Sequence, residues 1–235
     1  ALYRDMLQKD GYEDGHVRFK EHYNDWREII ASFGLGERFA NTDIREQAKG
    51  YIPTTEFYNR VYGQKGWKAI TIRSLSIGQG EILVTPLQLA NQAAAIANKG
   101  YYITPHFNRN DSMKSDIHTT LVDSTHFDVI HRGMARVMTD GTGRWYNIPE
   151  LQMCGKTGTV QNPHGEDHAL FIGFAPMDNP QIAVAVAVEN AGFGATWACP
   201  IATLVMEQYL TGEIQRNALY ERMANANLIE EQDEQ

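Results

Sequence analysis

The stretch Met153-Cys154-Gly155-Lys156-Thr157-Gly158-Thr159-Val160 determines how the rest of the chain is interpreted. We expect it to form a β-strand that carries one lysine, two threonine hydroxyls and two glycines. Thr157 and Thr159 lie two residues apart, so their hydroxyls share one face of the strand. The glycines leave room for another backbone or a ligand to approach closely. The pattern favours an extended ligand with a carboxylate end, which would pair along the strand while Lys156 and the hydroxyls hold its charge.

The composition is that of an ordinary globular protein. The 235 residues are 43% hydrophobic and 21% charged, with a formal net charge of −8. Because no dense Lys/Arg cluster accompanies this acidic balance, the sequence argues against a general nucleic-acid binder. No apolar run reaches the length of a transmembrane helix, and there is no signal peptide. The chain begins with Ala1 rather than Met, so we expect a fragment or a processed product.

Apolar spacing and turn residues predict helices in the first part of the chain and strands in the second. Thr85 and Pro86 have the residue types of a helix N-cap and first turn, and Gly100 would end that helix. Thr125 and Asp128 have the spacing of a capping box. We expect further helices at residues 1–10, 16–33, 125–139 and 196–210, short strands at 101–104 and 119–122, and a three-stranded antiparallel meander at 153–160, 169–175 and 181–188.

Three further segments resemble those of the class B penicillin-binding proteins. They are Ser76-Ile77-Gly78-Gln79-Gly80, Val84-Thr85-Pro86-Leu87-Gln88-Leu89-Ala90 and Ala94-Ala95-Ile96-Ala97-Asn98. In that family a Gly-Gln-Gly turn leads into a Thr-Pro-Leu-Gln helix, and a Lys-Thr-Gly strand follows at a fitting distance. The resemblance covers nearly the whole chain. Within the family it is nearest to the elongation-type transpeptidases, in a Bacteroidetes-like version.

Two motifs of that family are absent from these 235 residues. The family combines the Lys-Thr-Gly strand with a Ser-x-x-Lys nucleophile and a Ser-x-Asn motif. None of the serines in this sequence has lysine at the third position after it or asparagine at the second. In the family order both motifs would precede Ala1. We therefore interpret residues 1–235 as the C-terminal portion of a transpeptidase domain, inactive by itself, with a tail at 215–235 that frays.

The resemblance implies a fold and an activity. The fold is an α/β three-layer sandwich of antiparallel sheet flanked by helices, incomplete in this chain. The activity is peptidoglycan crosslinking by serine acyl transfer on D-Ala-D-Ala stem peptides, and β-lactam antibiotics would acylate the same serine. No cofactor or metal is implied. Elongation-complex membrane proteins would be partners of the parent protein at the periplasmic face of the inner membrane, in cell-wall elongation and rod shape.

The resemblance also implies roles for individual residues. Lys156 would supply positive potential at the anionic end of the substrate and help to move protons. Thr157, Gly158 and Thr159 would bind the substrate, and the backbone N–H of Thr159 would donate to the oxyanion. Asn162, in the loop after the strand, would touch the substrate because of its position.

Other interpretations of the function stay open at this point. The chain could be a non-catalytic pseudo-transpeptidase scaffold that lost its serine. It could also belong to a β-lactamase or D,D-carboxypeptidase of the same superfamily, although the Thr-Pro-Leu-Gln segment favours the transpeptidase.

Three local features also leave alternatives open. The loop His164–His168 holds two histidines and two acids, but its irregular spacing favours a solvated loop over a metal site. The aromatic-rich segment Tyr51–Trp67 would form either a groove wall or the packed surface of a long loop. Cys154 and Cys199 are expected as buried free thiols rather than as a disulfide.

Overall fold

The structure is a computed structural model that describes residues 15–108 and 116–229. The helix expected at residues 1–10 lies outside the described residues. The chain forms two compact units. The first holds residues up to Gln88 together with Tyr102–Val122, and the second holds Leu89–Tyr101 together with the chain from Asp123 onward.

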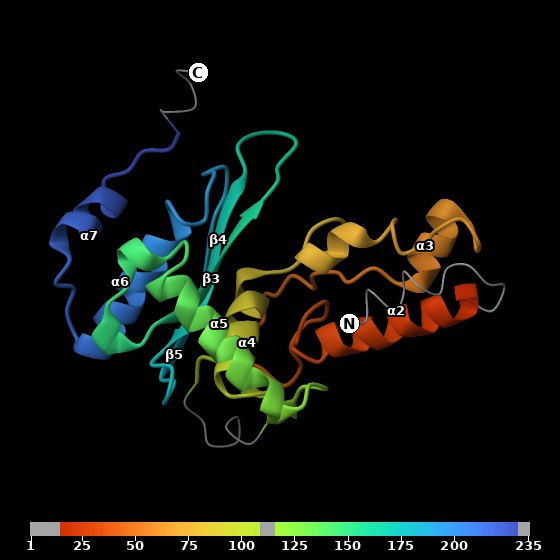
Figure 1. Ribbon diagram of the computed structural model, residues 1–235, viewed down its shortest axis with the longest axis horizontal. Helices are drawn as coiled ribbons and strands as arrows, with labels where there is room; N and C mark the ends of the chain where they lie inside the picture. Colours follow the sequence, from red (N-terminus) through yellow and green to blue (C-terminus); the bar gives the residue numbers. More distant parts are fainter. Residues whose placement is uncertain (1–14, 109–115, 230–235) are drawn as a thin grey trace. The chain divides into compact units, whose positions relative to one another are not determined.

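The described elements follow one another in the order shown in Figure 1. They are α2 (Gly15–Ala31), α3 (Thr55–Tyr62), the 3-10 helix η1 (Arg73–Ile77), α4 (Pro86–Ala97), β1 (Tyr101–Ile103), β2 (Ile117–Thr119), η2 (Ser124–His126), α5 (Phe127–Thr139), η3 (Arg144–Tyr146), η4 (Pro149–Leu151), β3 (Cys154–Val160), β4 (His168–Ala175), β5 (Ile182–Val188), α6 (Ala198–Thr211) and α7 (Asn217–Ala224). None of the helices among the described residues is long and apolar enough to cross a membrane.

An aromatic core holds the first unit together. Tyr23, Tyr58 and Trp67 are fully buried, and each ring contacts the other two at centroid distances of 5.0 to 5.8 Å. The indole N–H of Trp67 donates to the side-chain oxygen of Asn59 at 2.9 Å, so the one polar group of that ring is satisfied. Tyr58 and Trp67 of the segment Tyr51–Trp67 are therefore core residues and do not line a groove, whereas Tyr62 is 48% exposed.

The start of α4 confirms the predicted cap. The backbone N–H of Gln88 donates to Thr85 Oγ1 at 3.2 Å, and the Thr85 N–H donates to Gln88 Oε1 at 3.1 Å. These reciprocal bonds satisfy two donors at the helix start. The Gln88 amide also donates to the carbonyls of Glu37 and Lys49 at 2.8 and 3.0 Å. Gln88 is 1% exposed, so this one side chain ties two loop segments to the helix start.

Two local predictions before β3 were wrong. The strand that pairs with β1 is Ile117–Thr119, not residues 119–122, because the Thr104 N–H bonds to the Asp116 carbonyl and sets the register. The capping box before α5 does not form. The carboxylate of Asp123 instead accepts from the Thr125 N–H at 2.9 Å, which caps a 3-10 turn that precedes the helix.

The second unit is built on the predicted antiparallel meander, in the order β3-β4-β5. On one face Phe174 and Cys154 pack against residues of α4 and α5. On the other face Phe171 and Val184 pack against α6. Figure 1 shows the strands running between α6 on one side and α4 and α5 on the other. An antiparallel sheet with helices on both faces confirms the predicted α/β fold class.

The chain after α6 is more regular than expected. Asn217–Ala224 forms α7, inside the stretch that we expected to fray. The segment leading into it is held by Glu207, which is 2% exposed and accepts from Arg216 Nε at 2.8 Å and from the Gln215 N–H at 3.0 Å. Arg216 also donates to the carbonyl of Tyr146 at 2.8 Å. An ion pair between a buried carboxylate and a half-buried guanidinium thus anchors the segment that the sequence suggested was loose.

Candidate active site

The strand β3 lies at one edge of the three-stranded sheet and places the Lys-Thr-Gly residues there. In its register with β4, Lys156 is opposite Ile172 and Thr157 is opposite Phe171. Because side chains alternate along a strand, Thr157 and Thr159 share the face that packs against α6, as predicted. Lys156 lies on the opposite face. The ammonium and the two hydroxyls therefore approach the strand edge from two sides.

The two glycines of the strand have different structural surroundings. A Cβ on Gly155 would lie 2.1 Å from Cζ of Phe171, so the bare backbone there makes room for that ring. A Cβ on Gly158 would lie 3.2 Å from Cβ of Leu170 on the paired strand β4, so this position is a tight contact within the sheet. A Cβ on Gly194, in the loop after β5, would lie 2.2 Å from the Gly158 carbonyl oxygen. Gly155 is thus a packing residue of the core, whereas the missing side chain of Gly194, in the loop, lets that loop lie against the strand.

The Thr157 hydroxyl is held by a residue that the sequence did not identify. Thr157 Oγ1 and Thr142 Oγ1 are 2.8 Å apart, and either can be the donor. Thr142 lies in the segment Gly141-Thr142-Gly143 just after α5, beyond the end of the helix that the sequence predicted at residues 125–139. Because α5 packs along β3, the end of this helix lies next to the strand. The spacing within the chain gave no signal for this contact.

The Thr159 hydroxyl is approached by the loop after β5. The backbone N–H of Gly194 donates to Thr159 Oγ1 at 3.4 Å, a long hydrogen bond. The same loop is tied to the β3–β4 hairpin at its base, where the carbonyl of Asp167 accepts from the N–H groups of Ala191 and Gly192 at 2.9 and 2.7 Å. Residues far apart in sequence therefore fix the surroundings of Thr159.

Lys156 is exposed, and its ammonium stays close to the strand backbone. Nζ donates to the carbonyl of Thr157 at 2.7 Å. The side chain thus brings a full positive charge to the edge of β3 rather than extending it away from the sheet. A cation beside two fixed hydroxyls is suited to bind a carboxylate.

Asn162 has structural hydrogen bonds in the hairpin loop. Its Nδ2 donates to Asn190 Oδ1 at 2.7 Å, and its Oδ1 accepts from the His164 N–H at 3.0 Å. These bonds tie the hairpin to the loop after β5. Its contact with substrate stays a prediction. Among the residues that the structure describes, no group of three or more His, Cys, Asp or Glu side chains could hold a metal ion, in this loop or elsewhere.

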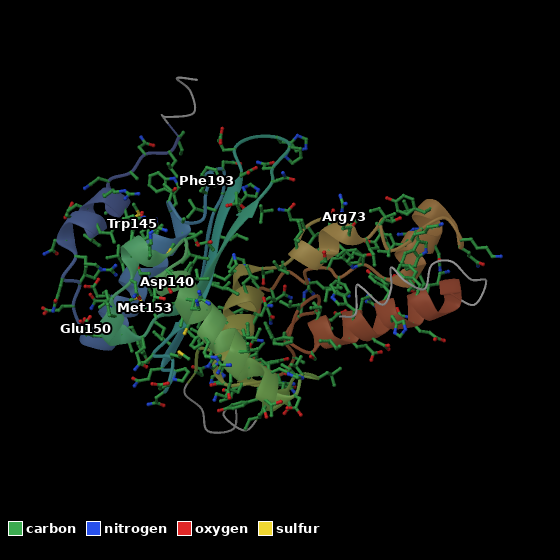
Figure 2. The ribbon with its side chains drawn as sticks, in the orientation of Figure 1. Arg73, Asp140, Trp145, Glu150, Met153 and Phe193 are labelled. Atoms are coloured by element: carbon green, nitrogen blue, oxygen red, sulfur yellow. The ribbon has the colours of Figure 1, made fainter. Side chains whose placement is uncertain are left out.

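Two large aromatic side chains protrude from loops of the second unit (Figure 2). Trp145, in η3, is 78% exposed, and Phe193, one residue before Gly194, is 72% exposed. The guanidinium of Arg144 lies 4.8 Å from the centroid of the Trp145 ring. Phe193 immediately precedes Gly194, whose N–H donates to the Thr159 hydroxyl, and Trp145 lies three residues after Thr142, whose hydroxyl is hydrogen-bonded to that of Thr157.

Neither cysteine is suited to act as a nucleophile. Both are buried and free, and they belong to clusters on opposite faces of the sheet, so they do not form a disulfide. Burial raises the pKa of the Cys154 thiol to about 12, and burial likewise raises the pKa of the Cys199 thiol to about 12. Both sulfurs therefore stay protonated near neutral pH, in agreement with their prediction as inert buried thiols.

Comparison with known proteins gives one consistent result. Residues 14–207 match the penicillin binding protein transpeptidase domain model. The chain is 33% identical over 215 residues to the peptidoglycan D,D-transpeptidase MrdA of Acinetobacter baumannii, a match that covers 81% of this chain and 31% of that protein.

Solved structures give the same result. Pseudomonas aeruginosa PBP2 in complex with WCK 5153 has a TM-score of 0.70 at 32% identity, covering 92% of this chain and 49% of that one. Penicillin-binding protein A from Mycobacterium tuberculosis, as an imipenem acyl-enzyme complex, has a TM-score of 0.64 at 26% identity, covering 84% and 44%. The chain spans about a third of the length of the curated relatives it matches.

Proposed function

Because the chain belongs to the penicillin-binding protein transpeptidase family, we propose that it supplies the Lys-Thr-Gly side of a serine D,D-transpeptidase active site. The observation that carries this proposal is the edge strand β3, where an exposed ammonium and two threonine hydroxyls meet. The substrate is a peptidoglycan stem peptide ending in D-Ala-D-Ala. The product is a crosslink between stems.

The reaction is acyl transfer in two steps. A serine outside these 235 residues attacks the carbonyl carbon between the two D-alanines, and the terminal D-alanine leaves as its amine after taking a proton. An amine of a neighbouring stem then attacks the serine ester, forms the new amide and returns the proton to the serine oxygen. β-Lactams acylate the same serine and stop at the ester.

In this scheme, the residues of β3 bind the negative charges of the substrate carboxylate and of the oxyanion. Thr157 and Thr159 hydrogen-bond the substrate carboxylate, and Lys156 supplies positive potential there and helps proton transfer. The backbone N–H of Thr159 donates to the oxyanion. In an antiparallel edge strand, every second residue directs its N–H and C=O away from the neighbouring strand. The Thr157 carbonyl accepts from Lys156 Nζ, which supports placing Thr157, and therefore Thr159, among these outward-facing residues. One such donor typically lowers the barrier by about 3–4 kcal/mol.

Within the cell we place this activity in cell-wall elongation. The similarity to MrdA proteins supports that assignment and the elongation-complex membrane proteins as partners. The site would work on the periplasmic face of the inner membrane, where peptidoglycan is built. The bacterial group of origin stays a prediction.

Covalent labelling with a fluorescent penicillin tests the proposal. We expect the 235-residue chain alone to give no adduct, because none of its serines has the nucleophile motif. The parent protein encoded by the full gene should be labelled at a serine outside these residues. A labelled serine inside the chain, or an unlabelled parent, would contradict the proposal.

A matched pair of lysine variants in the parent protein tests the role of the strand. Lys156→Met should slow acylation by about 10²- to 10³-fold, because it removes the charge that the site places at the strand edge. Lys68→Met is the control, since Lys68 is exposed and lies in the first unit. Equal acylation rates for both variants would show that Lys156 is only a surface lysine.

A further inference from the structure

One of the contacts that hold the base of the loop after β5 is made by a histidine. The backbone N–H of Asn190 donates to Nδ1 of His168, the first residue of β4, at 3.0 Å. A backbone N–H can only donate, so Nδ1 must be the unprotonated nitrogen and the ring must be neutral with its proton on Nε2. This hydrogen bond therefore exists in only one protonation state of the side chain.

Other hydrogen bonds at the base of the loop come from groups that do not change charge near neutral pH. The Asp167 carbonyl accepts two backbone N–H groups, from Ala191 and Gly192. The Asn162 amide donates to the Asn190 side chain. Histidine is the side-chain type that ordinarily gains a proton between pH 5 and 8. Of these anchors, the bond to His168 is the one that acid would remove.

Protonation of His168 at Nδ1 would replace its hydrogen bond from the Asn190 N–H by a repulsive contact. A second proton on the ring would place an N–H donor at Nδ1 directly against the N–H of Asn190. Glu189 follows Val188, which pairs with Ala169 next to His168. By sequence and strand register, the charged and titratable residues of the described chain that neighbour His168 are Asp167, Glu166 and His164 in the hairpin loop, Glu189 after β5 and, on the same face of β3, Lys156.

The position of this loop matters to the site because of where it leads. Four residues after Asn190, the Gly194 backbone lies against Gly158 and its N–H points at the Thr159 hydroxyl. A shift at the base of the loop is passed along this short segment. The residues that it would disturb are those that bind the substrate carboxylate and the oxyanion.

We propose that neutral His168 is a positioning residue of the active site, which seats the loop from Asn190 to Gly194 against Thr159, and that acid slows acylation by unseating this loop. The inference rests on the proposed transpeptidase function. It assigns His168 no contact with substrate, only control of the loop.

Three variants of the full-length parent protein test this role. His168→Asn keeps a side-chain acceptor close to the position of Nδ1 but cannot be protonated. His168→Leu removes the acceptor at every pH. His126→Asn is the control, because His126 is an exposed histidine of the second unit before α5. The acylation rate with fluorescent penicillin is measured for each protein from pH 5.5 to 7.5.

Dividing the acylation rate of each variant by that of the unaltered protein at the same pH separates the effect of the histidine from the effects of other titrating groups. We expect His168→Asn to keep most of the acylation rate at neutral pH and to lose less of it in acid than the unaltered protein does. At pH 5.5 its acylation rate should therefore exceed that of the unaltered protein by about tenfold. His168→Leu should be slow at all pH values, and His126→Asn should follow the unaltered protein. Identical pH profiles for His168→Asn and the unaltered protein would overturn the inference.

Amide hydrogen exchange separates this inference from the proposed function. The segment from Glu189 to Gly194 should exchange faster at pH 5.5 than at pH 7.5 in the unaltered protein, after correction for intrinsic rates, but not in His168→Asn. This result does not depend on acylation. Absence of labelling in every protein would refute the transpeptidase proposal, whereas unchanged exchange of this segment would refute the role of His168.

Discussion

A methyl group added at Gly194, a residue that has no assigned role in the chemistry, should disable the site. The added Cβ would lie 2.2 Å from the Gly158 carbonyl oxygen and 2.4 Å from the Leu170 carbonyl oxygen. Both are backbone atoms of paired strands and cannot turn away as a side chain would. Ordinary contact begins at 3.4 Å, so the loop must retreat by about 1.2 Å (3.4 minus 2.2).

A retreat of that size should be costly for the reaction. The Gly194 N–H is already 3.4 Å from Thr159 Oγ1, so it would leave hydrogen-bond range. Displacements of about 1 Å at a reacting centre can reduce rates by about 100-fold. We expect Gly194→Ala to slow acylation by that order. Overpacking should also lower the free energy of unfolding by about 1–3 kcal/mol.

The assay is the second-order rate of acylation of the parent protein by fluorescent penicillin, with thermal unfolding of the same samples. Gly133→Ala is the control, because an added Cβ in this exposed position of α5 meets no atom within 4 Å. It should leave acylation unchanged and raise stability by about 0.5–1 kcal/mol. If Gly194→Ala acylates as fast as the unaltered protein, the loop does not position Thr159.

Three further predictions concern the second unit. Gly155→Ala should lower the free energy of unfolding by about 1–3 kcal/mol in denaturant melts, because its Cβ would lie 2.1 Å from the Phe171 ring. Glu207→Gln should cost about 3–5 kcal/mol in the same measurement, because it leaves the Arg216 guanidinium without its buried partner. Cys154 and the other buried cysteine should not react with a thiol reagent at pH 8 until the protein is unfolded, because burial raises the pKa of each thiol to about 12 and reaction needs the thiolate.

Local sequence rules predicted the elements of the fold where the determinants lie close together in the chain. Strict alternation over Ile182–Val188 predicted β5, and the Thr85–Gln88 pair predicted the start of α4, since both signals are complete within a few residues. The rules failed where a partner that they did not consider determined the local structure. Asp123 displaced the expected capping box, and the Glu207–Arg216 ion pair ordered a tail whose composition suggested fraying.

In the candidate site, too, some features were predictable from the sequence and others were not. The strand residues and the shared face of the two threonines follow from a period of two, which any strand imposes. The partners of these hydroxyls, Thr142 and Gly194, come from loops 15 residues before Thr157 and 35 residues after Thr159. Glycine and threonine in loops are common, so their spacing carried no signal. Only the packing of α5 beside β3 and the seating of the loop after β5 bring them to the strand.

The placement of the cation and the hydroxyls on opposite faces of β3 explains why an edge strand suits this site. In the middle of a sheet, Lys156 and Thr157 would be separated by the sheet itself, and one ligand could not reach both. At an edge, a ligand that lies along the strand can be contacted from above and from below while it pairs with the outward backbone groups. The Lys156 ammonium already reaches the Thr157 carbonyl, so it need not cross the sheet to act on the same ligand. The alternation that separates the two kinds of side chain would thus let them converge on a ligand that pairs with β3 as an additional strand.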